Sequence, residues 1–207
     1  MTTNPIGMPY GASPQADATE AWSRRVRRIG GLNQVAYAFV LFWLIRGDLA
    51  YGDSAGLVVL VGALTVSGAA VAYGIRASAG KTPRPTSSEG RRLERAIIAA
   101  TVIQLAASFA APVVVAAAGH SDWVVPSIAV TIGPLLLWVD HRIRLPRYRF
   151  VGWALTLVPF VLMATMSGRT LAVTAGLGAG LLLLVTAAAG FRDLAQLPVT
   201  TPRRKDS

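Results

Sequence analysis

The stretch that decides the fold is LAVTAGLGAGLLLLVTAAAGF, residues 171–191, which contains no charged side chain. Crossing about 30 Å of hydrocarbon takes roughly 20 predominantly apolar residues in a helix, with a range of about 17 to 25. The length and composition of this stretch therefore predict a membrane-spanning helix. The rest of the chain can be interpreted outward from it, because similar runs recur on its N-terminal side.

Five further segments of the 207-residue chain meet the same requirement. The sequence therefore predicts an all-α fold, a polytopic bundle of six transmembrane helices. The expected spans are residues 29–45, 55–75, 96–118, 123–139, 150–167 and 171–191, which together make one transmembrane domain over residues 29–191.

The segments outside this domain are polar. We expect residues 1–15 to be a disordered N-terminal tail and residues 192–207 to be a cytoplasmic C-terminal tail. Residues 16–28 are predicted to be an amphipathic juxtamembrane segment, with apolar residues at helical spacing opposite four arginines. This segment either lies on the inner membrane surface or serves only as a positive flank that sets the orientation.

The composition favours a membrane protein over a nucleic-acid-binding protein. Charged residues make up 14% of the chain, against about 25% in soluble proteins, and the mean hydropathy is +0.51. A formal net charge of +10 would suggest a nucleic-acid partner in a soluble protein. Because the basic residues lie between long apolar runs, we expect the lipid bilayer, with anionic lipids at its cytoplasmic face, to be the partner, and no nucleic acid.

The positions of Lys and Arg predict the orientation. All but two of the 20 precede the first span, separate the second from the third or the fourth from the fifth, or follow the sixth. The two exceptions are Arg46 and Arg169. Because cytoplasmic loops of membrane proteins carry the excess of Lys and Arg, both termini are predicted to be cytoplasmic. We therefore expect a multi-pass protein of a bacterial inner membrane.

The sequence offers no constellation for catalysis, for a cofactor or for a metal. The absence of Cys excludes thiolate chemistry, and no Asp, Glu, Lys or His falls well inside an expected span, where such groups usually mark ion paths. His120 and Asp122 would provide only two metal ligands. Asp140 is expected to pair with a neighbouring arginine rather than to titrate with His141. We expect no enzymatic activity, no cofactor and no metal site.

Uncharged polar side chains inside the expected spans are the candidate functional site. Two interpretations stay open. The first is hydrogen bonding between helices, in which each bond contributes about 0.6 kcal/mol of stability on average. The second is a small polar cavity at mid-membrane between the third, fourth and fifth spans, where prolines add kink sites, as in transporters with broken helices. The candidates are Asn33, Gln34, Thr101, Gln104, Ser108, Ser127 and Thr131.

Two other groups of residues are candidates for contacts with lipid or with a helix. The arginines that follow the fourth span are predicted to contact lipid phosphate, each contributing about 1 kcal/mol near an anionic surface; they are Arg142, Arg144, Arg147 and Arg149. Small residues recur every four positions in the sixth span, so that another helix can approach closely; they are Ala172, Gly176 and Gly180. This face serves either internal packing or association with a second copy or a membrane partner protein.

Three short motifs carry a resemblance to a known group of proteins. They are Trp123-Val124-Val125-Pro126, Gly133-Pro134 and Arg147-Tyr148. Together they are similar to motifs of small six-helix integral membrane proteins of bacteria that have no assigned function. The resemblance implies the same six-helix architecture and carries over no functional residue.

Two functions remain open at this point. A small permease-like transport protein is the preferred hypothesis, because the third to fifth spans combine polar side chains with prolines. The alternative is a non-transporting membrane subunit or scaffold, which packs with itself or with a partner. Very short connections on the outer side and the lack of charge inside the spans favour this alternative.

The predicted orientation has a direct test, since the chain has no native Cys to label. Asp53→Cys, His120→Cys and Arg169→Cys variants should react with a membrane-impermeant maleimide applied to intact cells. Thr86→Cys and Arg147→Cys variants should react only after the membrane is permeabilised. Labelling of the Thr86→Cys variant in intact cells, at the rate seen for His120→Cys, would contradict the orientation.

Overall fold

The computed structural model describes residues 14–46, 54–79 and 88–197. Over these ranges the chain forms six α-helices and one 3-10 turn, and no described residue lies in a β-strand, which confirms the all-α prediction. The helices are α1 (Pro14–Ile45), α2 (Ser54–Ser78), α3 (Ser88–Ala117), α4 (Val124–Ile143), α5 (Pro146–Thr165) and α6 (Gly168–Gln196); the 3-10 turn, η1, covers Ser121–Trp123.

Five of the helical segments are long and apolar enough, by length and composition, to cross a membrane. They are Arg24–Ile45, Arg91–Ala117, Ser121–Ile143, Pro146–Thr165 and Gly168–Gln196. The remaining helix, α2, has 25 residues but is not among the five when only described residues are considered. Each of the six predicted spans thus coincides with a helix, and five of the helices carry a segment that meets the requirement for a span.

The helices extend past the predicted spans, mostly at the polar ends. α1 begins at Pro14, so residues 16–28 are the first half of one continuous helix rather than a separate segment. α3 begins at Ser88, and α6 continues to Gln196. Hydropathy locates the apolar part of a helix, whereas backbone hydrogen bonding continues into polar sequence. The predicted tails lie mostly outside the described residues, at 1–13 and 198–207.

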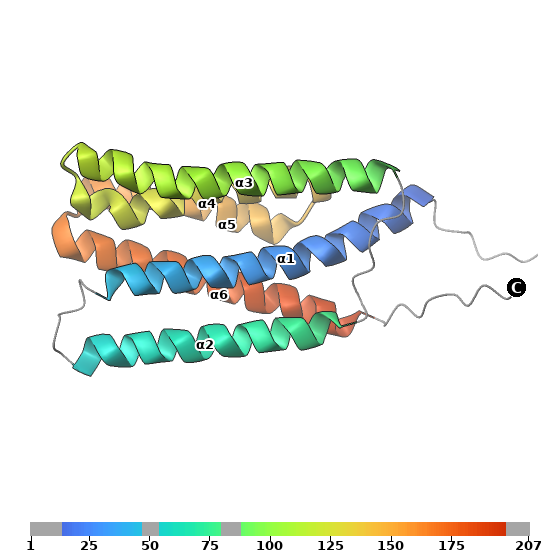
Figure 1. Ribbon diagram of the computed structural model, residues 1–207, viewed down its shortest axis with the longest axis horizontal. Helices are drawn as coiled ribbons and strands as arrows, with labels where there is room; N and C mark the ends of the chain where they lie inside the picture. The colour runs from blue at the N-terminus through green and yellow to red at the C-terminus, as the bar shows by residue number, and fades with distance from the viewer. Residues whose placement is uncertain (1–13, 47–53, 80–87, 198–207) are drawn as a thin grey trace, which may run out of the picture.

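The helices lie side by side in one bundle, with α2 and α3 on opposite sides of it (Figure 1). α1 packs mainly on α6, α4 packs mainly on α5, and α2 packs on α1 and α6. α3 packs chiefly on α4, and only 11% of the residues in its apolar window are buried, against 56% in that of α6. α1, α4, α5 and α6 therefore form the centre, and α2 and α3 are peripheral.

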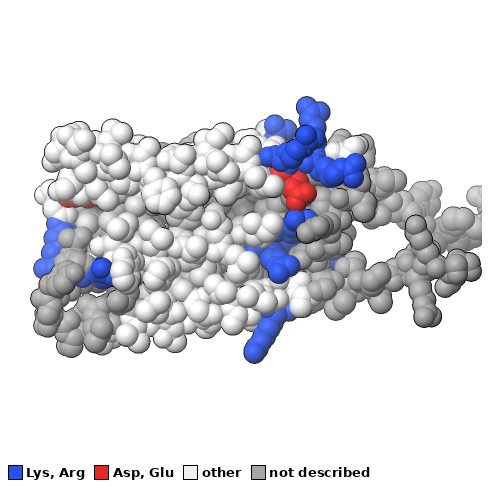
Figure 2. All heavy atoms as spheres, in the orientation of Figure 1, with Lys and Arg blue, Asp and Glu red and all other residues white. Residues whose placement is uncertain are grey.

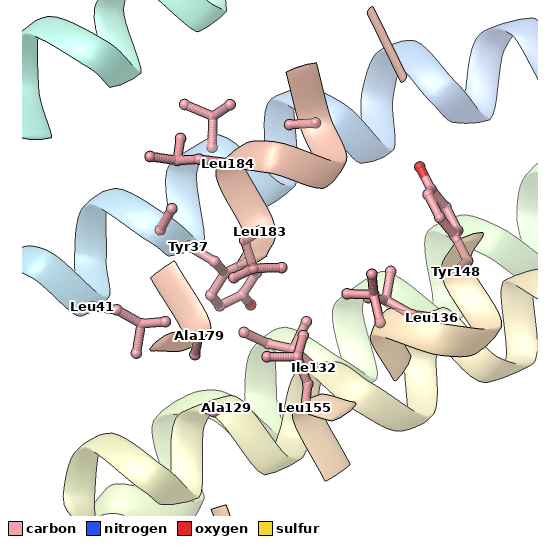
Figure 3. Close-up of a cluster of buried hydrophobic side chains, with 14 of the residues drawn as sticks. Tyr37, Leu41, Ala129, Ile132, Leu136, Tyr148, Leu155, Ala179, Leu183 and Leu184 are labelled. Carbon is pink, nitrogen blue, oxygen red and sulfur yellow. The ribbon is translucent and has the colours of Figure 1, made fainter. Parts of the chain in front are cut away.

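Large apolar side chains from the four central helices meet in the core of the bundle (Figure 3). Leu41 of α1 and Leu183 of α6 are fully buried, and Leu155 of α5 is nearly so. Tyr37 points from α1 into the middle of the bundle, between Leu183 and Ile132 of α4 (Figure 3). The aromatic ring of Tyr37 thus fills core space while its hydroxyl lies among apolar groups.

The predicted small-residue face of α6 lies against α1. Ala172, Gly176 and Gly180 are all buried. A β-carbon built at Gly180 would lie 2.7 Å from the ring of Phe42, and one at Gly176 would overlap the side chain of Ile45. Close packing of this kind maximises dispersion contacts between helices. The face is therefore occupied within this chain.

Near the C-terminal end of α6, the side chain of Phe191 packs between α1, α2 and α6. A β-carbon at Gly31 of α1 would lie 2.6 Å from the ring of Phe191, and one at Gly74 of α2 would lie 2.5 Å from it. The ring is completely buried. The absence of side chains at these two glycines thus leaves room for the ring of Phe191, and α1, α2 and α6 contact one another there.

α4 and α5 cross at another pair of glycines, Gly133 and Gly152. A β-carbon at Gly133 would lie 2.6 Å from the carbonyl oxygen of Gly152 and 2.9 Å from the backbone nitrogen of Thr156. These are backbone atoms, which cannot move aside unless the two helices separate. Pro134, one of the prolines in the third to fifth spans that were expected to add kink sites, lies on the exposed side, and α4 continues past it to Ile143.

Charged side chains gather at the two ends of the bundle, and a broad uncharged band separates them on the face shown in Figure 2. One end, called the basic end below, carries the N-terminal ends of α1, α3 and α5 and the C-terminal ends of α2, α4 and α6. Most of the described arginines belong to it. Arg46 and Arg169 lie at the other end, called the opposite end.

The close contact of α4 and α5 at Gly133 and Gly152 predicts that a single added methyl group lowers the stability of the protein. Gly133→Ala should destabilise the protein by about 1–3 kcal/mol, because the added carbon overlaps backbone atoms of α5. Thermal unfolding in detergent micelles measures the effect. Gly68→Ala is the matched control, since a β-carbon there meets nothing within 4 Å, and it should leave stability unchanged or raise it slightly. Equal stability of the two variants would contradict the crossing.

Candidate functional site

Polar side chains of α3 and α4 join in one hydrogen-bonded chain. The amide nitrogen Nε2 of Gln104 donates to Oγ of Ser108 at 3.0 Å, and Ser108 Oγ lies 2.7 Å from Thr131 Oγ1 across the two helices. The hydroxyl of Thr131 donates to the carbonyl oxygen of Ile128 at 2.7 Å. Because that bond uses the hydroxyl hydrogen of Thr131, Ser108 is the donor to Thr131.

Two other predicted candidates bond only within their own helices. The hydroxyl of Thr101 donates to the carbonyl oxygen of Ile97 at 2.9 Å, and that of Ser127 donates to the carbonyl oxygen of Val124 at 2.8 Å. Such bonds satisfy a hydroxyl in apolar surroundings. They do not connect one helix to another.

A pocket of about 420 Å³ lies between α1, α3 and α4 and is open on the side of the exposed residues Val40, Phe109 and Val113; it is called the central cavity below because it lies near the middle of the length of these helices. Its polar lining residues are Asn33 and Tyr37 of α1 and Ser108 of α3. The other lining residues are apolar and include Leu105 and Phe109. A volume of this size lies within the range of about 300–1,000 Å³ that is usual for small-molecule sites.

A second cavity, of about 450 Å³, lies between α3, α4 and α5 and is called the outer cavity below. Ser127 and Thr131 are its hydroxyl-bearing residues, and Trp123, Phe160 and Met163 are among its apolar ones. Its lining comes from the last part of α3, the first part of α4 and the last part of α5. The outer cavity therefore lies nearer the opposite end of the bundle.

Several buried polar atoms of α1 and α3 have no hydrogen-bond partner among the described residues, and of their residues only Tyr37 lines the central cavity. They are the hydroxyl of Tyr37, both amide atoms of Gln34 and the amide oxygen Oε1 of Gln104. Tyr37 lies one helical turn beyond Gln34, and all three residues are buried. An unsatisfied buried polar group costs about 1–3 kcal/mol. Water or a ligand is the ordinary partner for such groups.

The predicted candidates are thus divided between two cavities instead of lining one. Asn33 and Ser108 line the central cavity, Ser127 and Thr131 line the outer cavity, and Gln34, Thr101 and Gln104 are not among the lining residues of either. The predicted candidates included Asn33 and Gln34 of α1 but not Tyr37, which lines the central cavity. Helical spacing shows which residues share a face of one helix, but not which helices are neighbours. Tyr37 follows Gln34 by three residues and therefore lies on the same face of α1, and this spacing could have indicated that Tyr37 belongs to the candidate site.

Two of the four arginines predicted to contact lipid phosphate are engaged with carboxylates at the basic end. Arg147 forms a hydrogen-bonded ion pair with Asp193 of α6. The Nε atom of Arg149 donates to Oδ2 of Asp140 at 2.8 Å, and the side chain of Asp140 is only 5% exposed. The partner of Asp140 is therefore Arg149 rather than His141.

The other two arginines of this set face outward. The guanidinium of Arg142 lies 5.6 Å from the ring centroid of Trp138. Arg144 follows the last residue of α4, has a positive φ of 56°, and is exposed. The four arginines therefore do not form one continuous patch.

At the opposite end, His120 and Asp122 have separate structural contacts. Oδ2 of Asp122 accepts a hydrogen bond of 2.9 Å from the backbone N–H of Gly168, the first residue of α6. A carboxylate is favourable at the positive end of a helix. His120 stacks on Trp123 with ring centroids 4.3 Å apart. In the described part of the chain, no three His, Asp or Glu side chains form a group that could hold a metal ion.

A comparison of the sequence with protein families, with curated proteins and with solved structures finds no match in any of the three. The similarity of three short motifs to bacterial six-helix membrane proteins stays a prediction. The geometry of the two cavities is therefore the basis for a functional proposal.

The hydrogen bond between Ser108 and Thr131 predicts a measurable coupling between α3 and α4. A double-mutant cycle with Ser108→Ala and Thr131→Val should give a coupling of about 0.6 kcal/mol, and at most about 1.7 kcal/mol. Unfolding in detergent measures each variant. Ser108→Ala combined with Thr165→Val is the control, because Thr165 bonds its own helix on an exposed surface. Additive effects in both cycles would refute the contact.

Proposed function

We propose that the chain is a multi-pass protein of a bacterial inner membrane and acts as a small permease for uncharged, largely apolar solutes. All six helices span the bilayer in this proposal, and the basic end, with both termini, faces the cytoplasm. Five segments of span length and the uncharged band between the charged ends support the membrane placement. The arginines at one end support the orientation, since cytoplasmic loops carry most basic residues.

The observation that carries the transport proposal is the central cavity, with Asn33, Tyr37 and Ser108 in its lining. Tyr37 lies eight residues before the end of α1, about 12 Å along the axis at 1.5 Å per residue. Ser108 lies nine residues before the end of α3, about 14 Å along its axis. Both residues therefore lie near the middle of a hydrocarbon layer about 30 Å thick, the usual depth of transporter binding sites.

The lining of the two cavities indicates the class of solute. The described lining residues include no Asp, Glu, Lys, Arg or His, so a charged solute would leave its charge unpaired in an apolar environment. A molecule with one or two hydrogen-bonding groups on an apolar body matches Asn33, Tyr37 and Ser108. Movement down a concentration gradient needs no ionisable coupling group.

The two cavities also supply a direction for movement. Ser108 lines the central cavity, Thr131 lines the outer cavity, and their hydroxyl oxygens are 2.7 Å apart. A solute bonded to Ser108 can replace this contact and pass to Thr131, toward the opposite end. α3 must shift for the passage to open. Its sparse packing and the missing backbone N–H at Pro112 favour such a shift.

A second function, a non-transporting subunit or scaffold, is favoured by a different observation. α3 exposes a long apolar face that includes Val102, Ile103 and Phe109, the last of them 71% exposed. Lipid covers this face in a permease, whereas a partner helix would cover it in a scaffold. A stable complex of fixed stoichiometry that lacks solute flux would favour the scaffold.

Filling the central cavity tests the permease proposal. Ala36→Phe adds a ring to a lining position and should lower the efflux of small uncharged aromatic alcohols and amides from proteoliposomes about tenfold. A loss of about 1.4 kcal/mol in solute binding corresponds to a tenfold effect. The control is Ala106→Phe, which makes the same change at an exposed position of α3 that lines neither cavity. Efflux no faster than from protein-free liposomes, or equal in both variants, would refute the proposal.

A further inference from the structure

Three charged side chains from three helices meet at the basic end. Asp193 of α6 forms ion pairs with Arg147 of α5 and with Arg27 of α1, whose Nη1 lies 3.5 Å from the carboxylate. Both guanidinium groups use the same oxygen, Oδ2 of Asp193. Two positive charges thus share one negative charge, and the cluster retains a net charge of +1.

The two arginines of this cluster have unused donors. The Nε atom of Arg27 and the Nη1 atom of Arg147 are buried and have no hydrogen-bond partner among the described residues. The side chains of Arg27 and Arg147 are 25% and 33% exposed, so the cluster is open on one side. Arg147 is also the second residue of α5, where the helix dipole favours an anion. A second anion on the open side of the cluster would balance this charge.

The depth of the cluster indicates which anion is present there. Arg27 lies 18 residues before the end of α1, about 27 Å along the helix axis. That length is close to the hydrocarbon thickness of about 30 Å, so in the proposed membrane placement the arginines lie at the level of the headgroup phosphates. Phosphate is a preferred partner of guanidinium groups, because its oxygens accept several N–H donors at once.

The side chain of Tyr148 lies between the charged cluster and the core of the bundle. Its side chain is buried and points from α5 toward α1 (Figure 3), and a β-carbon at Gly30 would lie 2.9 Å from its hydroxyl oxygen. Gly30 lies close to Arg27 on α1 and Tyr148 follows Arg147, so the tyrosine lies directly behind the two arginines. A ligand would therefore approach from the surrounding lipid or water and not from the core.

We propose that Arg27 and Arg147 form a binding site for a phosphate group, carried by an anionic phospholipid or present as free phosphate. The site differs from the predicted set of four arginines, because it adds Arg27 from α1 and keeps only Arg147 of the four. Arg149 is paired with Asp140. It rests on the membrane placement in the proposed function, but not on solute transport. Asp193 pairs with both guanidinium groups and therefore competes with the phosphate for them.

The test compares two double variants of equal net charge in nanodiscs that contain phosphatidylcholine with phosphatidylglycerol. Native mass spectrometry counts the phosphatidylglycerol retained by each. Arg27→Gln/Arg147→Gln should lower its affinity about 25-fold, if each arginine contributes about 1 kcal/mol. Arg76→Gln/Arg192→Gln is the control, because it removes two exposed arginines at the same end. Equal losses in the two double variants would overturn the site.

Two further experiments are needed. The first distinguishes a lipid phosphate from free phosphate, and the second separates a loss of binding from a loss of folding. In nanodiscs of phosphatidylcholine alone, a rise in melting temperature with inorganic phosphate supports free phosphate as the ligand, and retention of phosphatidylglycerol without such a rise supports the lipid. Asp193→Asn removes the competing carboxylate, so it should retain the anion several-fold more tightly even if it lowers the melting temperature. Weaker retention in Asp193→Asn would overturn the proposal, because the aspartate would then be the essential group.

Discussion

The contact between α1 and α6 is the interaction on which the rest of the bundle depends. Small residues on α6 admit Phe42 and Ile45 of α1, so the two helices approach closely over much of their length. α2 packs against both members of this pair, and Phe191 packs between the three helices. In a bilayer, apolar side chains gain little by leaving lipid, and dispersion contacts from close packing become the main attraction. Glycine at these positions therefore stabilises the bundle by leaving space.

The same reasoning explains why α3 differs from the central helices. α3 lacks a close glycine contact among its described residues and packs mainly on α4. Polar contacts add to this packing: the chain from Gln104 through Ser108 to Thr131 at mid-length and the ion pair of Glu94 with Arg25, 2.7 Å long, at the basic end. Such contacts are weak individually. The cavities lie along this less tightly packed helix, which is consistent with a function that requires movement.

Ion pairs between helices hold the basic end together. The arginines at this end would repel one another if each stood alone, and the few carboxylates pair with some of them. Asp140 links α4 to α5, and Asp193 links α6 to α1 and α5. Since there are fewer carboxylates than arginines, donors remain for anions from the surroundings. At the opposite end, Asp122 instead accepts a hydrogen bond from the first residue of α6.

The sequence by itself determined the helical class, the approximate place of each helix and the separation of charge between two ends. These follow from properties of single segments: the length of an apolar run, the spacing of small residues and the position of arginines. The neighbours of each helix were decided only by the tertiary structure. Hydropathy cannot show that α1, rather than α5, completes the cavity beside Ser108, or that Arg27 joins Arg147 at Asp193. Those contacts depend on how side chains from distant segments fit together, and no property of one segment records that fit.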